Sequence, residues 1–214
     1  SRYTRRNRAE YRKIAGYIAR CVWQRPGNYM VFFPSYRLME DVLQVYEEEF
    51  SVDWVRCVCQ TPDMTEQERE EFLKKFEQER AHSLIGFCVM GGIFSEGIDL
   101  TEDKLIGAMI IGTGLPQVCL ERELLKYYFD RKNLNGFDYA YLYPGMNKVL
   151  QSAGRVIRTD QDRGVITLLD DRFMDRQCQE VFPREWNDFQ ICNSENIEEK
   201  IAKFWKAEEQ TDTK

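Results

Sequence analysis

Two arginines, Arg155 and Arg158, stand three residues apart in the stretch QSAGRVIRTDQDRGVITLLDDRF, which begins at Gln151. If the chain from Lys148 to Arg158 is helical, Gln151, Arg155 and Arg158 fall at positions i, i+4 and i+7 and share one face. Guanidinium groups bind phosphate oxygens through a planar fork of donors. With few acids nearby before Asp160, this spacing favours a phosphate clamp, and a solvated arginine face is the alternative.

A glycine-rich segment, GGIFSEGID, follows the apolar run that ends at Met90. Its glycines permit tight turns and a close approach of the backbone to a ligand. Within it, Ser95 offers a hydroxyl group, and Asp99 offers a carboxylate that can accept a hydrogen bond from a ribose hydroxyl. Taken alone, such a loop is as often a simple turn as a binding site.

Alternating strands and helices must position these residues. Short apolar runs predict strands and amphipathic runs between them predict helices. The strands are expected at Tyr29–Phe33, Asp53–Gln60, Leu84–Met90, Ala108–Ile111 and Val165–Leu169. The helices are expected at about Arg8–Trp23, Arg37–Phe50, 66–80, Val118–Lys132, Met146–Arg158 and Asn196–Glu208. This order predicts an α/β fold, doubly wound, with a mainly parallel sheet and helices on both of its faces.

In such sheets, functional groups gather in the loops beyond the carboxyl ends of the strands. The turn Pro34-Ser35-Tyr36-Arg37 follows the first expected strand, and the glycine-rich segment follows the third. Ser35 can also cap the next helix. We therefore expect both loops to lie at one edge of the sheet.

The composition is that of a globular domain. The chain has 214 residues, of which 43% are hydrophobic, and a formal net charge of -6. No run approaches the roughly 18 apolar residues of a membrane span, so we expect one domain over residues 1–214, cut from a longer protein, and no membrane partner. Residues 1–25 hold eight basic residues and one acid; Arg5, Arg6 and Arg8 either contact a phosphate backbone or belong to a solvated helix face.

The seven cysteines favour packing over chemistry. Their number is odd, they lie in apolar segments, and no CxxC motif occurs. Cys57 and Cys59 would share one face of a strand. Since His82 is the only histidine, a zinc site is disfavoured, and we expect no metal ligands in this chain. This pattern indicates reduced cysteines used as small core residues in the cytoplasm.

Three segments together resemble a known family. GGIFSEGIDL, at about 91–100, is similar to motif V of superfamily 2 helicases in the XPD/DinG-like branch, and QSAGRVIR, at about 151–158, with its continuation is similar to motif VI. VFFPSYRLMEDV, at about 31–42, resembles motif IV. The resemblance implies a RecA-like C-terminal motor domain of an ATP-dependent DNA helicase, which translocates 5′ to 3′ on a single strand.

This resemblance also implies roles for individual residues. Arg155 and Arg158 would be catalytic arginine fingers at the γ-phosphate of ATP. Gln151, Gly154, Glu96, Gly97 and Asp99 would lie beside the nucleotide, whereas Ser35, Tyr36 and Ser95 would contact single-stranded DNA.

Half of the catalytic machinery is missing from the sequence. No G-x-x-x-x-G-K-[ST] segment occurs, so the lysine that cradles the phosphates is absent. Asp170 and Asp171 end an apolar run as Mg²⁺ ligands would, but they follow motif VI in the family pattern and have no partner P-loop. The resemblance thus implies that ATP and Mg²⁺, and an iron–sulfur cluster where there is one, belong with an N-terminal motor domain, and that this fragment alone is inactive.

A second function remains open. The chain could be a RecA-like module that binds nucleic acid or protein without completing an ATPase. As a helicase fragment it is expected to be monomeric, bacterial and cytoplasmic, associated with the nucleoid when working, with a role in DNA repair implied by resemblance only.

Overall fold

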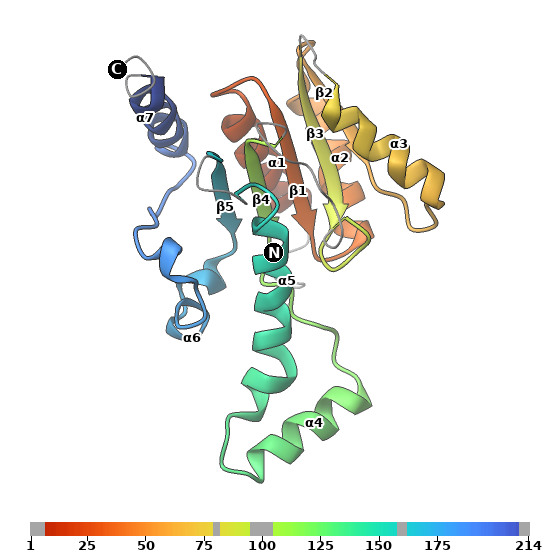
Figure 1. The fold of residues 1–214 in the computed structure, drawn as a ribbon, viewed down its shortest axis with the longest axis vertical. Coiled ribbons are helices and arrows are strands. Elements are labelled where there is room, and N and C mark those ends of the chain that lie inside the picture. Colours follow the sequence, from red (N-terminus) through yellow and green to blue (C-terminus); the bar gives the residue numbers. More distant parts are fainter. Residues whose placement is uncertain (1–6, 79–81, 95–104, 158–161, 210–214) are drawn as a thin grey trace.

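The computed structural model describes residues 7–78, 82–94, 105–157 and 162–209, and the structural statements below concern these residues. Five strands form one all-parallel sheet in the order β2-β3-β1-β4-β5 (Figure 1). They are β1 (Asn28–Phe33), β2 (Val55–Cys59), β3 (Ser83–Val89), β4 (Gly107–Ile111) and β5 (Val165–Leu169). Each lies within two residues of its expected position, which confirms the parallel α/β fold.

Helices cover both faces of this sheet. One face carries α1 (Arg8–Val22), α2 (Tyr36–Glu49) and α7 (Ile197–Glu209), and the other carries α3 (Glu66–Glu77), α5 (Tyr143–Ala153) and the short α6 (Arg176–Gln179). Alternate residues of β1 enter opposite cores: Tyr29, Val31 and Phe33 pack on the α1 side, and Met30 and Phe32 on the α5 side. A strand buried on both faces explains the continuous apolar run in the sequence.

Side-chain caps fix where several helices begin. The carboxamide of Asn7 accepts a hydrogen bond from the backbone of Glu10 (3.0 Å), and Ser35 Oγ accepts one from Leu38 N (3.4 Å). Thr65 and Glu68 cap each other reciprocally at the start of α3, which confirms the capping box in the sequence.

The expected helix Met146–Arg158 has the wrong bounds. It begins earlier, because a π-helical turn (Asp138–Leu142) leads directly into α5, and it ends at Ala153 with Gly154 as its C-cap. Glycine is a poor helix former. The next two amides close tight i to i−3 bonds, Arg155 N to Ser152 O (3.4 Å) and Val156 N to Ala153 O (3.2 Å). Arg155 therefore lies past the helix, in a turn.

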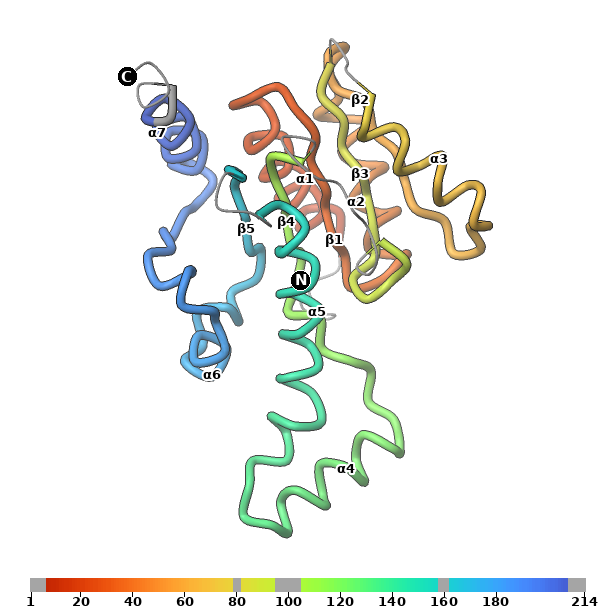
Figure 2. Tube along the Cα trace, viewed as in Figure 1, coloured from red at the N-terminus to blue at the C-terminus, as the bar shows by residue number. Residues whose placement is uncertain are grey.

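Helix α4 (Leu120–Asp130) stands away from the sheet, beyond the N-terminal end of α5 (Figures 1 and 2). Helix α4 contacts the π-helical turn through a mixed face: Arg122 Nη1 donates to Ala140 O (3.0 Å), Glu123 accepts from the Tyr141 hydroxyl, and Phe129 stacks on Tyr139. Its apolar side faces outward, with exposed fractions of 71% for Leu120, 60% for Leu124 and 60% for Tyr127. We call these three residues the α4 stripe. No residue of α4 is buried, so this helix exposes the side that would ordinarily pack inward.

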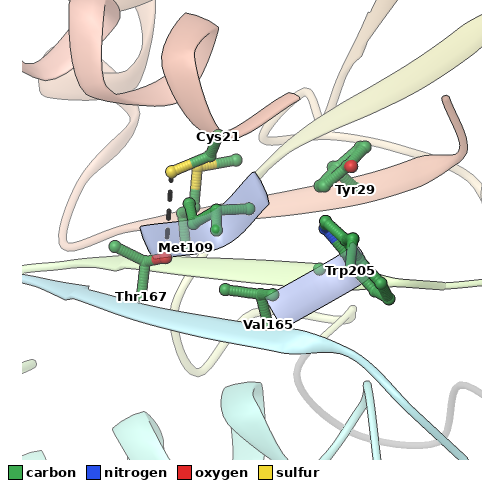
Figure 3. Close-up of a pocket in the computed structure, with 8 residues that line it drawn as sticks. Cys21, Tyr29, Met109, Val165, Thr167 and Trp205 are labelled. Atoms are coloured by element: carbon green, nitrogen blue, oxygen red, sulfur yellow. Dashed lines mark hydrogen bonds between the residues drawn. The ribbon is translucent and has the colours of Figure 1, made fainter. Parts of the chain in front are cut away.

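The buried cysteine side chains pack in the apolar core, as expected from the sequence. Cys21 lies beside a void of about 10 Å³, where its sulfur is 3.9 Å from Thr167 Oγ1 and Trp205 and Val165 complete the wall (Figure 3). Burial raises the pKa of the Cys21 thiol to about 12, so this sulfur stays protonated at neutral pH. Cys57 and Cys59 pack against the same core cluster, which confirms their shared strand face. Among the described helices, none is long and apolar enough to cross a lipid bilayer.

Candidate functional site at the carboxyl edge of the sheet

The carboxyl ends of β1, β2 and β3 bring three polar segments together. The backbone of Met90, just past β3, donates to Phe33 O at the end of β1 (2.8 Å), so both strands end at the same level. Ser35 and Tyr36 follow β1 directly, and Gly91 follows Met90. The expectation that the first and third loops lie at one edge is thus confirmed for their described residues.

Ser35 and Tyr36 form the first turn of α2. The Ser35 hydroxyl is used as the N-cap, and the Tyr36 hydroxyl accepts a hydrogen bond from Gln60 Nε2 (2.8 Å). Burial raises the pKa of the Tyr36 phenol, against a smaller lowering by the Gln60 bond. At neutral pH the phenol therefore remains protonated and can act as a neutral donor.

Gln60, which follows β2, was not among the site residues expected from the sequence. Its side chain is only 2% exposed, and its Oε1 accepts from Val89 N (2.9 Å). One carboxamide therefore joins the start of α2 to the end of β3. Only one feature of the sequence could have indicated Gln60: it is a polar residue directly after an apolar strand, at the edge of the sheet where the loops gather.

The glycine-rich segment begins as a tight turn against α5. Gly91 has a φ of +69°, a conformation that glycine adopts without strain. A Cβ placed on Gly91 would lie 3.1 Å from Cε of Lys148. Lys148, also not expected from the sequence, therefore crosses over this turn and brings an ammonium group to the edge. Ser95, Glu96, Gly97 and Asp99 lie outside the described residues.

The end of α5 differs from its expected geometry. Gln151 is exposed on the last turn, Gly154 caps the helix, and Arg155 is half-buried in the turn that follows. Because α5 ends at Ala153, Gln151 and Arg155 do not share the helical face expected for them. Arg158 itself lies outside the described residues. What remains is a polar helix end followed by a guanidinium group.

Asp170 is engaged structurally. Its carboxylate accepts from Arg172 Nε (2.8 Å), Nη2 (2.9 Å) and N (3.0 Å) and caps a 3₁₀ turn, Asp171–Met174. Among the described residues, no group of three or more His, Cys, Asp or Glu side chains is placed to hold a metal ion. This arrangement agrees with reading Asp170 as the end of a strand rather than as a Mg²⁺ ligand.

The basic N-terminal helix is paired with acids. Arg8 bonds to Glu48 (2.7 Å) and Glu49 (3.1 Å) on α2, and Arg12 also bonds to Glu49. For Arg8, the structure therefore favours the alternative of a solvated helix face. Arg5 and Arg6 lie outside the described residues.

A groove of about 1110 Å³ lies between α1, β5, α7 and residues 182–192, and it reaches the carboxyl end of β5. Its wall is mainly apolar and includes Gly154, but not Tyr36, Gln60, Gln151 or Arg155. Of the expected site residues that the structure describes, Gly154 alone lines this groove.

Comparison with known proteins identifies the kind of domain. The family model described as "Helicase C-terminal domain" matches residues 18–189. A "Regulator of telomere elongation helicase 1 homolog" of Caenorhabditis briggsae is 27% identical over 215 residues, covering 88% of this chain and 21% of that protein. The same-named protein of Drosophila melanogaster is 30% identical over 196 residues, covering 82% and 19%. The "General transcription and DNA repair factor IIH helicase subunit XPD/RAD3" of Saccharomyces cerevisiae is 31% identical over 163 residues, covering 72% and 20%.

Solved structures agree with the fold. The structure "XPD_APO" superimposes with a TM-score of 0.65 at 22% identity, covering 84% of this chain and 36% of that one. S. tokodaii Xpd4 gives a TM-score of 0.57 at 16% identity, covering 86% and 35%. This likeness confirms the expected RecA-like fold.

The curated relatives are longer than this chain, and their organisms can be compared with the expected bacterial source. The chain spans about a fifth of the length of the curated relatives named above. They come from a nematode, an insect and a yeast, so these comparisons give no support to the expected bacterial origin.

Proposed function

Because the chain belongs to the helicase C-terminal domain family of XPD-like and telomere-elongation-regulator-like helicases, we propose that it is the second motor domain of an ATP-dependent DNA helicase. In this role it supplies arginine fingers to ATP hydrolysis and part of the track for a single DNA strand. It works only when paired with an N-terminal motor domain of the same polypeptide. A role in DNA repair rests on the printed description of the yeast relative.

One observation carries the proposal: hydrogen-bond donors and cations gather where the family's segments meet. Tyr36, the Gly91 turn and Lys148 lie at the carboxyl edge of the sheet. Farther along the chain, Gln151 lies on the last turn of α5 and Arg155 in the turn that follows the helix. Neutral donors and ammonium groups suit the phosphates of a strand, and guanidinium groups suit the charge that develops at a γ-phosphate.

ATP is the substrate of this reaction, and the described residues fit one side of it. They provide cations, whereas the acid nearest to the Mg²⁺ pattern, Asp170, is occupied by Arg172. We therefore assign Arg155 and Arg158 to the γ-phosphate, and Gln151, Gly154, Glu96, Gly97 and Asp99 to the nucleotide side of the cleft. The P-loop and the metal ligands are assigned to the N-terminal motor domain.

The test is Arg158→Ala in a polypeptide that carries both motor domains. A group that acts only on the transition state lowers kcat with little effect on ATP binding. We expect DNA-stimulated ATPase to fall about 10²–10⁴-fold, with no rescue by Arg158→Lys because an ammonium group lacks the planar fork. The unfolding free energy should change by less than about 0.5 kcal/mol.

An unchanged ATPase rate with a lower unfolding free energy would mean that Arg158 is structural rather than catalytic. An unsubstituted polypeptide that shows no DNA-stimulated ATPase would favour the non-catalytic binding module. Measuring both the rate and the stability on the same protein separates these outcomes.

A further inference from the structure

The carboxamide of Gln60 is held from both ends in a buried position. Its Oε1 accepts a hydrogen bond from Val89 N at 2.9 Å, and its Nε2 lies 2.8 Å from the Tyr36 hydroxyl oxygen. Its own backbone nitrogen donates to Phe87 O (2.9 Å). Because only 2% of the surface of Gln60 is exposed, this side chain has little freedom to rotate. Its oxygen and its nitrogen therefore each keep a fixed partner.

The orientation of the carboxamide follows from the chemistry of its partners. A backbone N–H group only donates, so the side-chain oxygen of Gln60 must face Val89. The NH₂ group must then face Tyr36. Because an NH₂ group only donates, the Tyr36 oxygen accepts this bond, and the phenolic proton points elsewhere. In the part of the chain that the structure describes, the Tyr36 proton has no acceptor.

The surroundings of Tyr36 suit an anionic acceptor for this proton. Tyr36 is the first residue of α2, where the free N–H groups of a helix favour negative charge. The ring is half-buried, and burial keeps the pKa of the phenol raised. The hydroxyl is therefore a neutral, oriented donor at the surface edge of the site.

We propose that Gln60 is a positioning residue that directs the Tyr36 hydroxyl proton toward a phosphate oxygen of a bound single DNA strand. This inference rests on the proposed function and assigns Gln60 a part in it. Hydroxyl groups of tyrosine are common donors to nucleic-acid phosphates. Gln60 acts through Tyr36 and does not touch the strand.

Two single variants and their combination test the proposal. Tyr36→Phe removes the proton donor. Gln60→Glu keeps the size of the side chain and the bond from Val89, but its carboxylate only accepts at pH 8, so it draws the Tyr36 proton inward. Binding of a fluorescently labelled oligothymidylate of 20 nucleotides is measured by anisotropy at pH 8. We expect each single variant to bind about tenfold more weakly, as for a lost hydrogen bond to a charged group.

The double variant, with the unfolding free energy measured for every variant, distinguishes positioning from a structural role. If both changes remove the same hydrogen bond, Tyr36→Phe combined with Gln60→Glu binds no more weakly than Gln60→Glu alone. Since Tyr36→Phe removes a neutral donor, the slope of log affinity against log salt should stay unchanged. Gln67→Glu on the exposed side of α3 controls for the added negative charge, and it should bind as the unsubstituted chain does.

Three results would overturn the proposal. If the losses of affinity in the two single variants multiply in the double variant, Gln60 acts by another route. If Gln60→Glu binds the oligonucleotide as the unsubstituted chain does, Gln60 does not orient Tyr36. A loss confined to Mg·ATP, titrated in parallel, would place the hydroxyl on the nucleotide. An unsubstituted chain that does not bind the oligonucleotide would contradict the strand contact in the proposed function itself.

Discussion

At the scale of single residues, the carboxyl edge of the sheet is built from donors and cations. Tyr36 supplies a neutral donor, which the buried Gln60 carboxamide holds in place, and Lys148 supplies positive charge. The acid that ends β5, Asp170, is turned into the structure and bound by Arg172. The residues left at the edge therefore suit phosphate groups.

The Asp170–Arg172 pair predicts a specific response to acid. Burial alone would raise the pKa of Asp170, but the hydrogen bonds and charge of Arg172 outweigh it and hold that pKa well below its ordinary value. A carboxylate with a lowered pKa stabilises the fold above its unfolded value, about 3.9, and this contribution is lost as the pH falls from there through the lowered value. We expect Asp170→Asn to lower the unfolding free energy by about 2–3 kcal/mol at pH 7.

Urea unfolding at pH 7 and pH 2.5 checks this. The two proteins should differ at pH 7 and approach each other at pH 2.5. Asp188→Asn, at an exposed carboxylate, is the control and should change little at either pH. Equal stability of Asp170→Asn and the unsubstituted chain at pH 7 would mean that the pair does not stabilise the fold.

At the scale of elements, the strands and most helix bounds followed from the sequence, but the bounds of α5 did not. Continuous apolar runs such as Tyr29–Phe33 predict buried strands because burial on both faces leaves no polar positions. The end of α5 depended on whether Gly154 would continue a helix or end one, which local pattern does not decide. Gln60 acquires its partners only because β3 lies between β2 and β1, an order that no local segment encodes.

Helix α4 shows a second limit of predicting structure from the spacing of apolar residues. Its amphipathic spacing predicts a helix but also predicts that the apolar side is buried. In the structure, Leu120, Leu124 and Tyr127 stay exposed. The contacts with the π-helical turn are made by a mixed face with Arg122, Glu123 and Phe129. A pattern locates an amphipathic helix, but what each face meets depends on the rest of the fold.

The exposed α4 stripe yields a prediction about stability and association. We expect Leu124→Glu to change the unfolding free energy by less than about 0.5 kcal/mol, because the side chain is already in water. The same change should reduce association of the chain at high concentration, since it interrupts an exposed apolar surface. Calorimetry and light scattering measure the two effects.

Leu142→Glu is the matched control. Leu142 is 4% exposed, and a charge placed there should destabilise the fold by several kcal/mol. If Leu124→Glu were as destabilising as Leu142→Glu, the stripe would be part of the core rather than a surface.

At the scale of the whole molecule, one sheet separates two apolar cores. The chain carries a net charge of -6, so the proposed binding of a DNA strand would depend on a local patch rather than on overall attraction. The family match accounts for one motor domain of the two that the proposed reaction needs.

We expect the isolated chain to hydrolyse no ATP, because the sequence contains no P-loop to hold the β- and γ-phosphates. Phosphate release by the purified chain, with and without single-stranded DNA, is the measurement. Turnover that is abolished by Asp171→Asn would contradict this expectation and restore the acids after β5 as metal ligands. Turnover that survives this change would point to a contaminating ATPase.

The strand order also governs when the chain can fold on the ribosome. β1 pairs only with β3 and β4, and β2 pairs only with β3. About fifty residues separate Phe33 from Ser83, so at roughly 5–20 residues per second β1 waits about 3–10 s for its first neighbour to be synthesised. During that interval an apolar segment of the nascent chain is available to chaperones and to other chains. Nascent chains that stop before β3 should therefore contain no paired strand of the described sheet, however stable the finished domain is.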